Sequence, residues 1–287
     1  MIKTFDKSEL KKLFKPKEKS SGEDNGQITV IGGSKLFHGA PLYTLKIASR
    51  IVDMVFFATP EKSVGYVAEN LKSKLLSFIW VPWEDLEAYV AKSDAILIGP
   101  GLMRYGKENQ NSRIKVQNGN FDNDGKLTRD ITKNLLKKFP NKKWVIDAGS
   151  LQVMEAEWIP EGSILTPNKK EFEMLFKSDF TNEQVVVNAK KYNCLIVAKG
   201  PETLVATPTD AVLIKGGNAG MTKGGTGDIL AGLIVALLAK NKSFLAACAA
   251  SFVEKSAADK LYEKVGTNYN ADDLSSKIPE TLNSLSG

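Results

Sequence analysis

The feature that most restricts the fold of this chain is a regular alternation of short apolar runs with helical patterns, which begins at about residue 27. The runs are rich in β-branched and aromatic residues and read, in order, ITVIG, MVFFAT, SFIWV, AILIG, WVID, SILT and LIVAK. Strands that alternate with helices are typical of a largely parallel sheet covered by helices on both faces. Two further runs, TLVAT and AVLIK, flank the turn residues PTD and predict an antiparallel hairpin, so we expect a mixed sheet at that end.

Two segments stand outside this alternation. Residues 1–25 predict a short amphipathic helix followed by a polar linker, and residues 26–287 a single α/β domain. The apolar side of the short helix consists of Leu10, Leu13 and Phe14. Within the domain, residues 104–129 are polar and rich in asparagine, and we expect an exposed excursion or a small hairpin there.

Three helical patterns close the chain, at residues 228–240, 244–264 and 271 to about 285. The first two are apolar on most sides, so we expect them to be buried against the sheet or against a partner subunit. The second possibility suggests a homo-oligomer.

Composition and charge exclude several classes of function. Cys194 and Cys248 lie in apolar surroundings without C-x-x-C spacing, which predicts reduced thiols and a cytoplasmic protein. The longest apolar run, residues 229–239, is far shorter than the ~20 residues of a membrane span, so no membrane association is expected. The net charge of +6 comes from dispersed lysines without a recognised nucleic-acid-binding module, and therefore favours an anionic small molecule over nucleic acid as partner.

Unusual residues follow almost every predicted strand, at the sheet edge where open parallel sheets bind their ligands. These strand-end segments read GGSKLFHGAP, GPG, DAGS, TPNKKE, KGPET and NAGMTKGGTGD. The first is either an ordinary glycine-rich turn or a backbone surface that a flat ligand can approach. His38 is the only histidine, which excludes a multi-histidine metal site.

The TPNKKE segment has two possible interpretations. Asn168 and Glu171 are three residues apart at a predicted helix start, so they could form a capping box with no further role. Alternatively, the amide and the carboxylate could orient water molecules around Mg²⁺ beside bound phosphates.

The segment KGGTGDILAG, residues 223–232, carries the strongest chemical pattern. The N–H groups of a glycine-rich turn that opens a helix point outward and bind phosphate oxygens, assisted by the helix dipole. Asp228 could be a simple N-cap, but that does not explain the glycines before it. Beside a bound phosphate, its carboxylate could instead accept the proton of an attacking hydroxyl as a general base. Neither the P-loop pattern nor the Rossmann fingerprint fits these residues.

Taken together, these segments resemble a known family. VIGGSKLFHGAP, ILIGPGL, VIDAGSL, ILTPNKKEF, LIVAKGPETLVATP and GGTGDILAGLIVALLA are similar in order and spacing to the ADP-dependent NAD(P)H-hydrate dehydratases of the ribokinase-like superfamily. The similarity runs from about residue 27 to residue 285. It implies a three-layer α/β/α ribokinase-like fold with a mostly parallel central sheet.

The resemblance also implies a reaction. Family members phosphorylate the C6 hydroxyl of hydrated NADH or NADPH with ADP, or with ATP in some branches, and the phosphate then leaves to restore the dihydropyridine. Asp228 matches the family's base, and the amides of Gly225 to Gly227 would steady the transferred phosphoryl group. We expect Mg²⁺ as the cofactor, held through water by Asn168 and Glu171.

By the same resemblance, two sets of residues bind ligands. The substrate set is Ala40, Gly101, Asn168 and Asp228. The nucleotide set is Lys199, Gly200, Pro201, Glu202, Thr203, Gly225, Thr226 and Gly227. The chain departs from the family pattern at Asn168, where many members have histidine, and at Phe37, where tyrosine is usual.

Two other functions remain open at this stage. A ribokinase-like kinase for a vitamin-precursor or sugar alcohol would share Asp228 and the glycine turn and differ in its acceptor pocket. A nucleotide-binding sensor on the same fold would bind nucleotide without turnover.

Overall fold

A computed structural model describes residues 2–71, 77–105 and 123–287. Within these residues, ten strands form a single sheet in the order β1-β10-β9-β8-β7-β6-β5-β2-β3-β4. Neighbouring strands are parallel except around β9, which is antiparallel to both β8 and β10. In chain order the strands are β1 (Lys3–Thr4), β2 (Gln27–Ile31), β3 (Met54–Ala58), β4 (Ile79–Trp80), β5 (Ala95–Ile98), β6 (Lys143–Ile146), β7 (Ile164–Leu165), β8 (Leu195–Ala198), β9 (Thr203–Ala206) and β10 (Ala211–Ile214).

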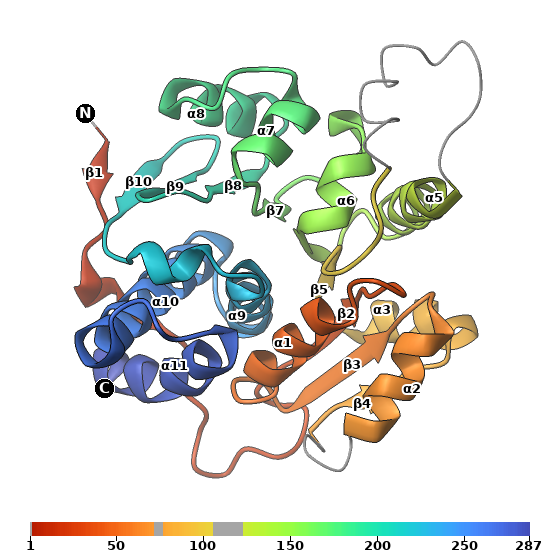
Figure 1. Ribbon diagram of the computed structural model, residues 1–287, viewed down its shortest axis with the longest axis horizontal. Helices are drawn as coiled ribbons and strands as arrows, with labels where there is room; N and C mark the ends of the chain where they lie inside the picture. The colour runs from red at the N-terminus through yellow and green to blue at the C-terminus, as the bar shows by residue number, and fades with distance from the viewer. Residues whose placement is uncertain (1, 72–76, 106–122) are drawn as a thin grey trace.

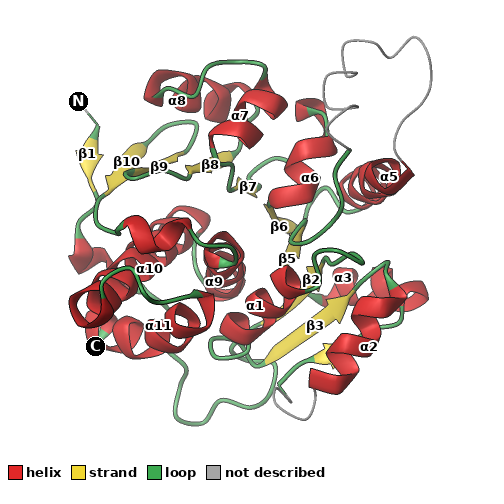
Figure 2. Ribbon diagram, viewed as in Figure 1, coloured by secondary structure: helices red, strands yellow, loops and turns green. Residues whose placement is uncertain are grey.

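Helices cover both faces of this sheet, as Figures 1 and 2 show. One face carries α1 (Gly39–Ala48), α2 (Lys62–Leu71), α9 (Thr226–Lys240), α10 (Ser243–Val265) and α11 (Ala271–Ser286). The other face carries α3 (Leu86–Lys92), α5 (Asn123–Lys138), α6 (Ala148–Val153), α7 (Lys169–Phe176) and α8 (Asn182–Lys191). Short 3₁₀ helices lie at η1 (Lys7–Lys12), η2 (Trp83–Asp85), η5 (Ala156–Trp158) and η6 (Ala219–Thr222). The predicted three-layer α/β/α fold with a mostly parallel sheet is confirmed.

The central strands are buried on both sides, which explains why they appear in the sequence as continuous apolar runs. On β5, Leu97 packs into the hydrophobic core beneath α1 and α9, whereas Ile96 and Ile98 pack into the core on the opposite face. All of the predicted strands are present, the hairpin of β9 and β10 among them.

The N-terminal segment differs from its prediction in detail. Residues Lys7–Lys12 form a 3₁₀ helix, not an α-helix, with the side chain of Asp6 accepting a hydrogen bond from the N–H of Ser8 at its start. Leu10 is fully buried and Phe14 is exposed. The two residues of β1, which the sequence did not reveal, pair in parallel with β10 at the edge of the sheet. The division between residues 1–25 and the rest of the chain remains a prediction.

The polar segment 104–129 was only partly anticipated. Its last residues, from Asn123 onward, are not an excursion but the first turns of α5, because Thr128, Ile131 and Leu135 recur at helical spacing and are buried. Residues 106–122 of the predicted excursion lie outside the described residues.

The apolar helices α9 and α10 are buried within the chain itself. They pack against each other and share one hydrophobic core with residues of α1, α11 and the sheet. Their apolar side chains therefore need no partner subunit to cover them, and the oligomeric state stays a prediction. Of the helices described, none is both long and apolar enough to cross a membrane.

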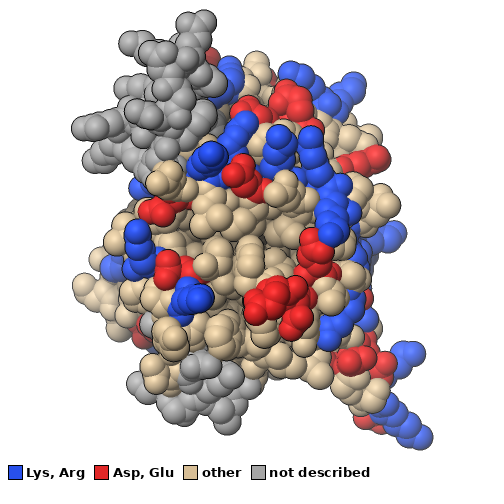
Figure 3. Space-filling view, turned by 90° about the vertical axis from the view of Figure 1, so that its right-hand side faces the viewer, with Lys and Arg blue, Asp and Glu red and all other residues tan. Residues whose placement is uncertain are grey.

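Charged side chains are mixed on the face of the molecule drawn in Figure 3. Lysine and arginine side chains lie there beside aspartate and glutamate, around a central area without charges. The formal net charge of +6 is therefore not gathered into one basic surface on this face.

Candidate active site

The loops that follow β2, β5 and β6 touch one another through their main chains. A Cβ atom on Gly99 would lie 1.8 Å from the carbonyl oxygen of Asp147, and one on Gly101 would lie 2.2 Å from that of Phe37. Both residues also have positive φ, +124° and +72°. Glycine is therefore required at these positions by the approach of neighbouring backbones as well as by conformation. The space beside the GPG segment is thus partly filled by the adjacent loops.

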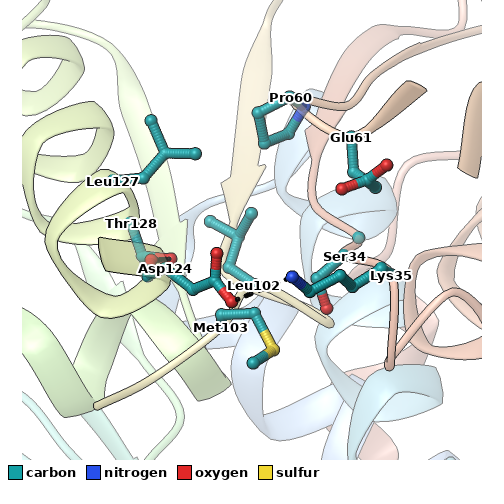
Figure 4. A pocket seen from close by; sticks show the side chains of 10 residues that line it. Ser34, Lys35, Pro60, Glu61, Leu102, Met103, Asp124, Leu127 and Thr128 are labelled. Atoms are coloured by element: carbon teal, nitrogen blue, oxygen red, sulfur yellow. Dashed lines mark hydrogen bonds and ion pairs between the residues drawn. The ribbon is translucent and has the colours of Figure 1, made fainter. Parts of the chain in front are cut away.

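A small cavity opens beside these loops, between the segment after β2 and the start of α5 (Figure 4). Lys35 reaches across it to Asp124, with 3.5 Å between Nζ and Oδ2. The cavity has a volume of about 40 Å³, which admits a few water molecules and not a nicotinamide ring.

The glycine-rich turn before α9 is closely packed. Gly225 is the N-cap residue with a φ of +96°, and a Cβ atom there would lie 2.7 Å from Tyr43 and 2.8 Å from Ala271. The hydroxyl of Thr226 lies 2.8 Å from the carbonyl oxygen of Met221 and 3.0 Å from that of Lys223, so it shapes the turn. The first N–H groups of a helix have no intrahelical partner, so those of α9 can bind an anion.

Asp228 lies in the first turn of α9, next to the start of α1. The hydroxyl of Thr44 is within hydrogen-bond distance of two carbonyl oxygens, that of Asp228 at 3.1 Å and that of Ala40 at 3.4 Å. The pKa of Asp228 is raised to about 7, mainly by burial and then by the negative charge of Asp147, against the opposing effect of Lys199. A carboxylate with this pKa can both accept and release a proton near neutral pH.

Lys199, the first residue after β8, lies among buried carboxylates. Its Nζ donates a hydrogen bond to Asp147 Oδ1 at 2.9 Å and lies 3.8 Å from Glu171 Oε2. Burial lowers the pKa of Lys199, but the negative charges of Asp147, Glu171 and Asp228 outweigh it and raise the pKa above its ordinary value. Lys199 therefore remains a cation, and a Cβ atom on Gly227 would lie 3.4 Å from its Nζ.

Asn168 and Glu171 form a capping box, which was one of the two interpretations of the TPNKKE segment. Asn168 Oδ1 accepts a hydrogen bond from the N–H of Glu171, and Glu171 Oε2 accepts one from the N–H of Asn168. The amide of Gln152 donates to Glu171 Oε1 at 3.2 Å. Burial raises the pKa of Glu171, against the lowering effect of Lys199.

This arrangement restricts how a metal ion could bind. Among the described residues no group of three or more acidic, histidine or cysteine side chains is placed to hold one. The oxygens of Asn168 and Glu171 are the type that Mg²⁺ prefers, but each already accepts a hydrogen bond from the protein. Each of these oxygens keeps a second lone pair, so both residues can accept hydrogen bonds from water molecules bound to Mg²⁺.

A cavity of about 680 Å³ lies beside the N-terminus of α9, within the usual size range of small-ligand sites. Many of the residues predicted to bind nucleotide or substrate line it: Asn168, Lys199, Gly200, Pro201, Thr203, Thr226 and Gly227. The other predicted residues do not line this cavity, namely Ala40, Gly101, Glu171, Glu202, Gly225 and Asp228. Glu202 is exposed.

Several polar residues of the site were missed in the sequence. Asp147 belongs to the DAGS segment but was not singled out, although it is 1% exposed and accepts hydrogen bonds from Lys199 and Thr166. Glu254 and Lys255, in the middle of α10, also line the large cavity. Their signal in the sequence is a pair of adjacent charges inside the otherwise apolar run AACAASFVEKSAA.

A single mostly parallel sheet between two helical layers, with a glycine-rich turn and a carboxylate at the start of a buried helix, is the arrangement of the ribokinase-like α/β fold. The chain belongs to the NAD(P)H-hydrate dehydratase family, whose model matches residues 28–280.

The chain is similar to two named relatives. It is 34% identical to a bifunctional NAD(P)H-hydrate repair enzyme of Methanocaldococcus jannaschii, over 96% of this chain and 51% of that protein. It is 28% identical to an ADP-dependent (S)-NAD(P)H-hydrate dehydratase of Nitrosopumilus maritimus, over 95% of this chain and 94% of that one. The chain thus spans about half the length of the bifunctional relative.

One solved structure shows how far the fold is shared. The ADP/ATP-dependent NAD(P)H-hydrate dehydratase of Bacillus subtilis, co-crystallised with ATP and Mg²⁺, superposes with a TM-score of 0.76 at 21% identity, over 99% of both chains. This similarity confirms the fold.

Proposed function

We propose that the chain repairs damaged nicotinamide nucleotides. It uses ADP or ATP to dehydrate hydrated NADH or NADPH, and releases AMP or ADP together with phosphate. The observation that carries this proposal is the carboxylate of Asp228, with a pKa of about 7, in the first turn of a helix whose N-terminus can bind phosphate. Membership of the NAD(P)H-hydrate dehydratase family supports the choice of substrate.

The large cavity is the proposed nucleotide site. Gly227 and Lys199 lie at the end where the phosphates bind, because the helix N–H groups and the ammonium group both favour negative charge there. The loop from Lys199 to Thr203 then borders the rest of the nucleotide. Ala40 and Gly101, which do not line this cavity, contact the hydrated dinucleotide, as does Asn168 from the cavity wall.

In the proposed reaction, Asp228 accepts the proton of the C6 hydroxyl as that oxygen attacks the terminal phosphorus of ADP. The bond from phosphorus to the bridging oxygen breaks, and AMP leaves. The bond between C6 and the ester oxygen then breaks, phosphate leaves with the bonding electrons, driven by the lone pair of the ring nitrogen, and loss of a proton from C5 restores the dihydropyridine. Lys199 and the first N–H groups of α9 stabilise the charge on the transferred group.

Mg²⁺ is part of the proposal. The fit of Asn168 and Glu171 through water supports it, as does the presence of ATP and Mg²⁺ with the relative from B. subtilis. When bound, the ion would neutralise part of the phosphate charge. We also propose a cytoplasmic location, which the two buried free thiols, Cys194 and Cys248, support.

A repair assay tests the function. Hydrated NADH is incubated with ADP or with ATP, and recovery of the NADH absorbance is followed for the wild type and for Asp228→Asn. We expect recovery with at least one nucleotide and a large loss in the variant, while nucleotide binding is retained. Failure with both nucleotides, together with phosphorylation of a vitamin-precursor alcohol, would establish the small-molecule kinase instead. Nucleotide binding without any turnover would indicate a sensor.

A further inference from the structure

Glu254 is a buried carboxyl group without a role in the reaction above. It lies in the middle of α10, is 4% exposed and lines the large cavity. Its Oε1 is buried and has no hydrogen-bond partner in the described part of the chain. A buried oxygen without a hydrogen-bond partner is costly, so a side chain that keeps one while it lines a cavity is suited to accept a hydrogen bond from a ligand there.

The two nearest lysines do not fill that position. Lys255 Nζ has carbonyl partners in its three hydrogen bonds: Pro201 at 2.8 Å, Gly216 at 3.0 Å and Gly200 at 3.4 Å. An ammonium group has three N–H donors, so these bonds occupy it. Lys199 donates to Asp147. Both lysines act on Glu254 only through their charge, and burial outweighs them and raises the pKa of Glu254 to about 8.

The cavity that Glu254 lines has apolar as well as polar walls. Leu230 lies one helical turn beyond Gly227 on α9, and Met221 and Pro201 also line the cavity. Apolar walls match the two faces of a flat ring, whereas a ribose carries hydroxyl groups that favour a polar or hydrated setting. With the phosphates at Gly227 and Lys199, the base is the part of the nucleotide that would lie against these side chains.

We propose that Glu254 accepts a hydrogen bond from the exocyclic amino group of the bound adenine and thereby selects adenine over other bases. This assignment rests on the proposed nucleotide site. At neutral pH the carboxyl group keeps its proton, so it presents an acceptor and a donor side by side. Both edges of adenine offer the matching pair, an amino group next to a ring nitrogen, in the way that a glutamine side chain pairs with adenine.

Two substitutions separate hydrogen bonding from packing. Glu254→Gln keeps an acceptor and a donor of the same shape, and Glu254→Met fills the same volume without either. Binding of ADP is compared by calorimetry with binding of purine riboside diphosphate, which lacks only the amino group. We expect the wild type and Glu254→Gln to prefer ADP by about tenfold, the value of one hydrogen bond, and Glu254→Met to bind both equally. Thermal unfolding of each variant confirms that it is folded.

The result that would overturn the proposal is an undiminished preference for ADP in Glu254→Met. The same conclusion follows if that variant instead stops discriminating between ADP and 2′-deoxy-ADP, because Glu254 would then contact the ribose. It follows too if the wild type binds neither ADP nor its analogue. If ADP binds with the expected preference but hydrated NADH is not repaired, the proposed repair function is wrong and the proposed role of Glu254 in binding adenine is still supported.

Discussion

The ammonium group of Lys199 lies 2.9 Å from Asp147 Oδ1 at a point where three acidic side chains act on one cation. The other two acids are Glu171, whose Oε2 is 3.8 Å away, and Asp228. The positive charge of Lys199 therefore offsets part of the negative charge of these three carboxyl groups before any phosphate binds. Its position beside Gly227 makes Lys199 part of both the proposed phosphate site and the environment of Asp228, the proposed base.

Replacing Lys199 with methionine should move the pH dependence of the reaction. Lys199 lowers the pKa of Asp228, so its removal raises that pKa above about 7 and shifts the rising limb of the kcat/KM profile to higher pH. Nucleotide affinity should also fall, by roughly tenfold or more, because a charge-assisted contact to phosphate is lost. Lys199→Arg, which keeps the charge, is the matched control. An unshifted pH profile in Lys199→Met would mean that Lys199 does not lower the pKa of Asp228.

Asp228→Asn should lower kcat by roughly 10²- to 10⁴-fold, the usual contribution of a general base, while ADP still binds. In the wild type the carboxylate must be ionised to accept a proton, so the rate should rise with pH and reach half its maximum near pH 7. Steady-state kinetics across pH measure the change in rate, and calorimetry shows whether ADP still binds. Asp130→Asn, at an exposed aspartate on α5, is the control. A nearly active Asp228→Asn would remove the base assignment.

Two neighbouring glycines provide a matched pair for the turn before α9. Gly225→Ala should lower the free energy of unfolding by roughly 2 kcal/mol or more, because alanine is strained at a φ of +96° and its Cβ would collide with Tyr43 and Ala271. Gly224→Ala should change it by less than about 0.5 kcal/mol, since nothing lies within 4 Å of its Cβ position. Urea unfolding measures both. Equal losses would show that the turn is not held as described.

Asn168 can be tested for a role beyond helix capping. Asn168→Ser keeps a capping oxygen and should leave stability nearly unchanged, whereas Asn168→Ala should cost about 1 kcal/mol. If the side chain also contacts the hydrated dinucleotide, as proposed, both variants should raise KM for that substrate. Thermal unfolding and kinetics together separate the two roles. Full activity in Asn168→Ser would mean that Asn168 caps α7 and does not contact the substrate.

Lys255 should act on nucleotide binding through the loop that it holds. Lys255→Met removes the hydrogen bonds to Gly200, Pro201 and Gly216, so the loop after β8 loses its anchor to α10. We expect KM for the nucleotide to rise by about tenfold while kcat changes little, because uniform binding is what is lost. Lys264→Met, at an exposed position on the same helix, is the control. A fall in kcat with unchanged KM would contradict this positioning role.

Much of the fold was predictable because it depends on local patterns. The strands are buried on both faces and therefore appear as apolar runs, and the parallel topology brings their carboxyl ends to one edge. The turn at Gly225 to Gly227 was recognisable for the same reason, since its glycines are adjacent in the sequence. β1 was not, because two residues carry no periodicity.

The parts of the site that the sequence concealed depend on tertiary packing. Lys199 and Asp147 are 52 residues apart, and only the pairing of β6, β7 and β8 brings them together. Glu254 and Lys255 belong to a helix whose composition is typical of a core. That two charges in this helix reach the large cavity follows from the packing of α10 beside the loop after β8.

The main-chain contacts at Gly99 and Gly101 restrict how the proposed substrate side of the site can evolve. The main chain of each loop there packs directly against the main chain of the next, so an insertion or deletion in one loop displaces its neighbour as well. New acceptor specificities on this scaffold should therefore arise by exchange of side chains and not by changes in loop length. A mutagenesis library for altered acceptors would best keep these backbones intact and vary the side chains that surround Asp228.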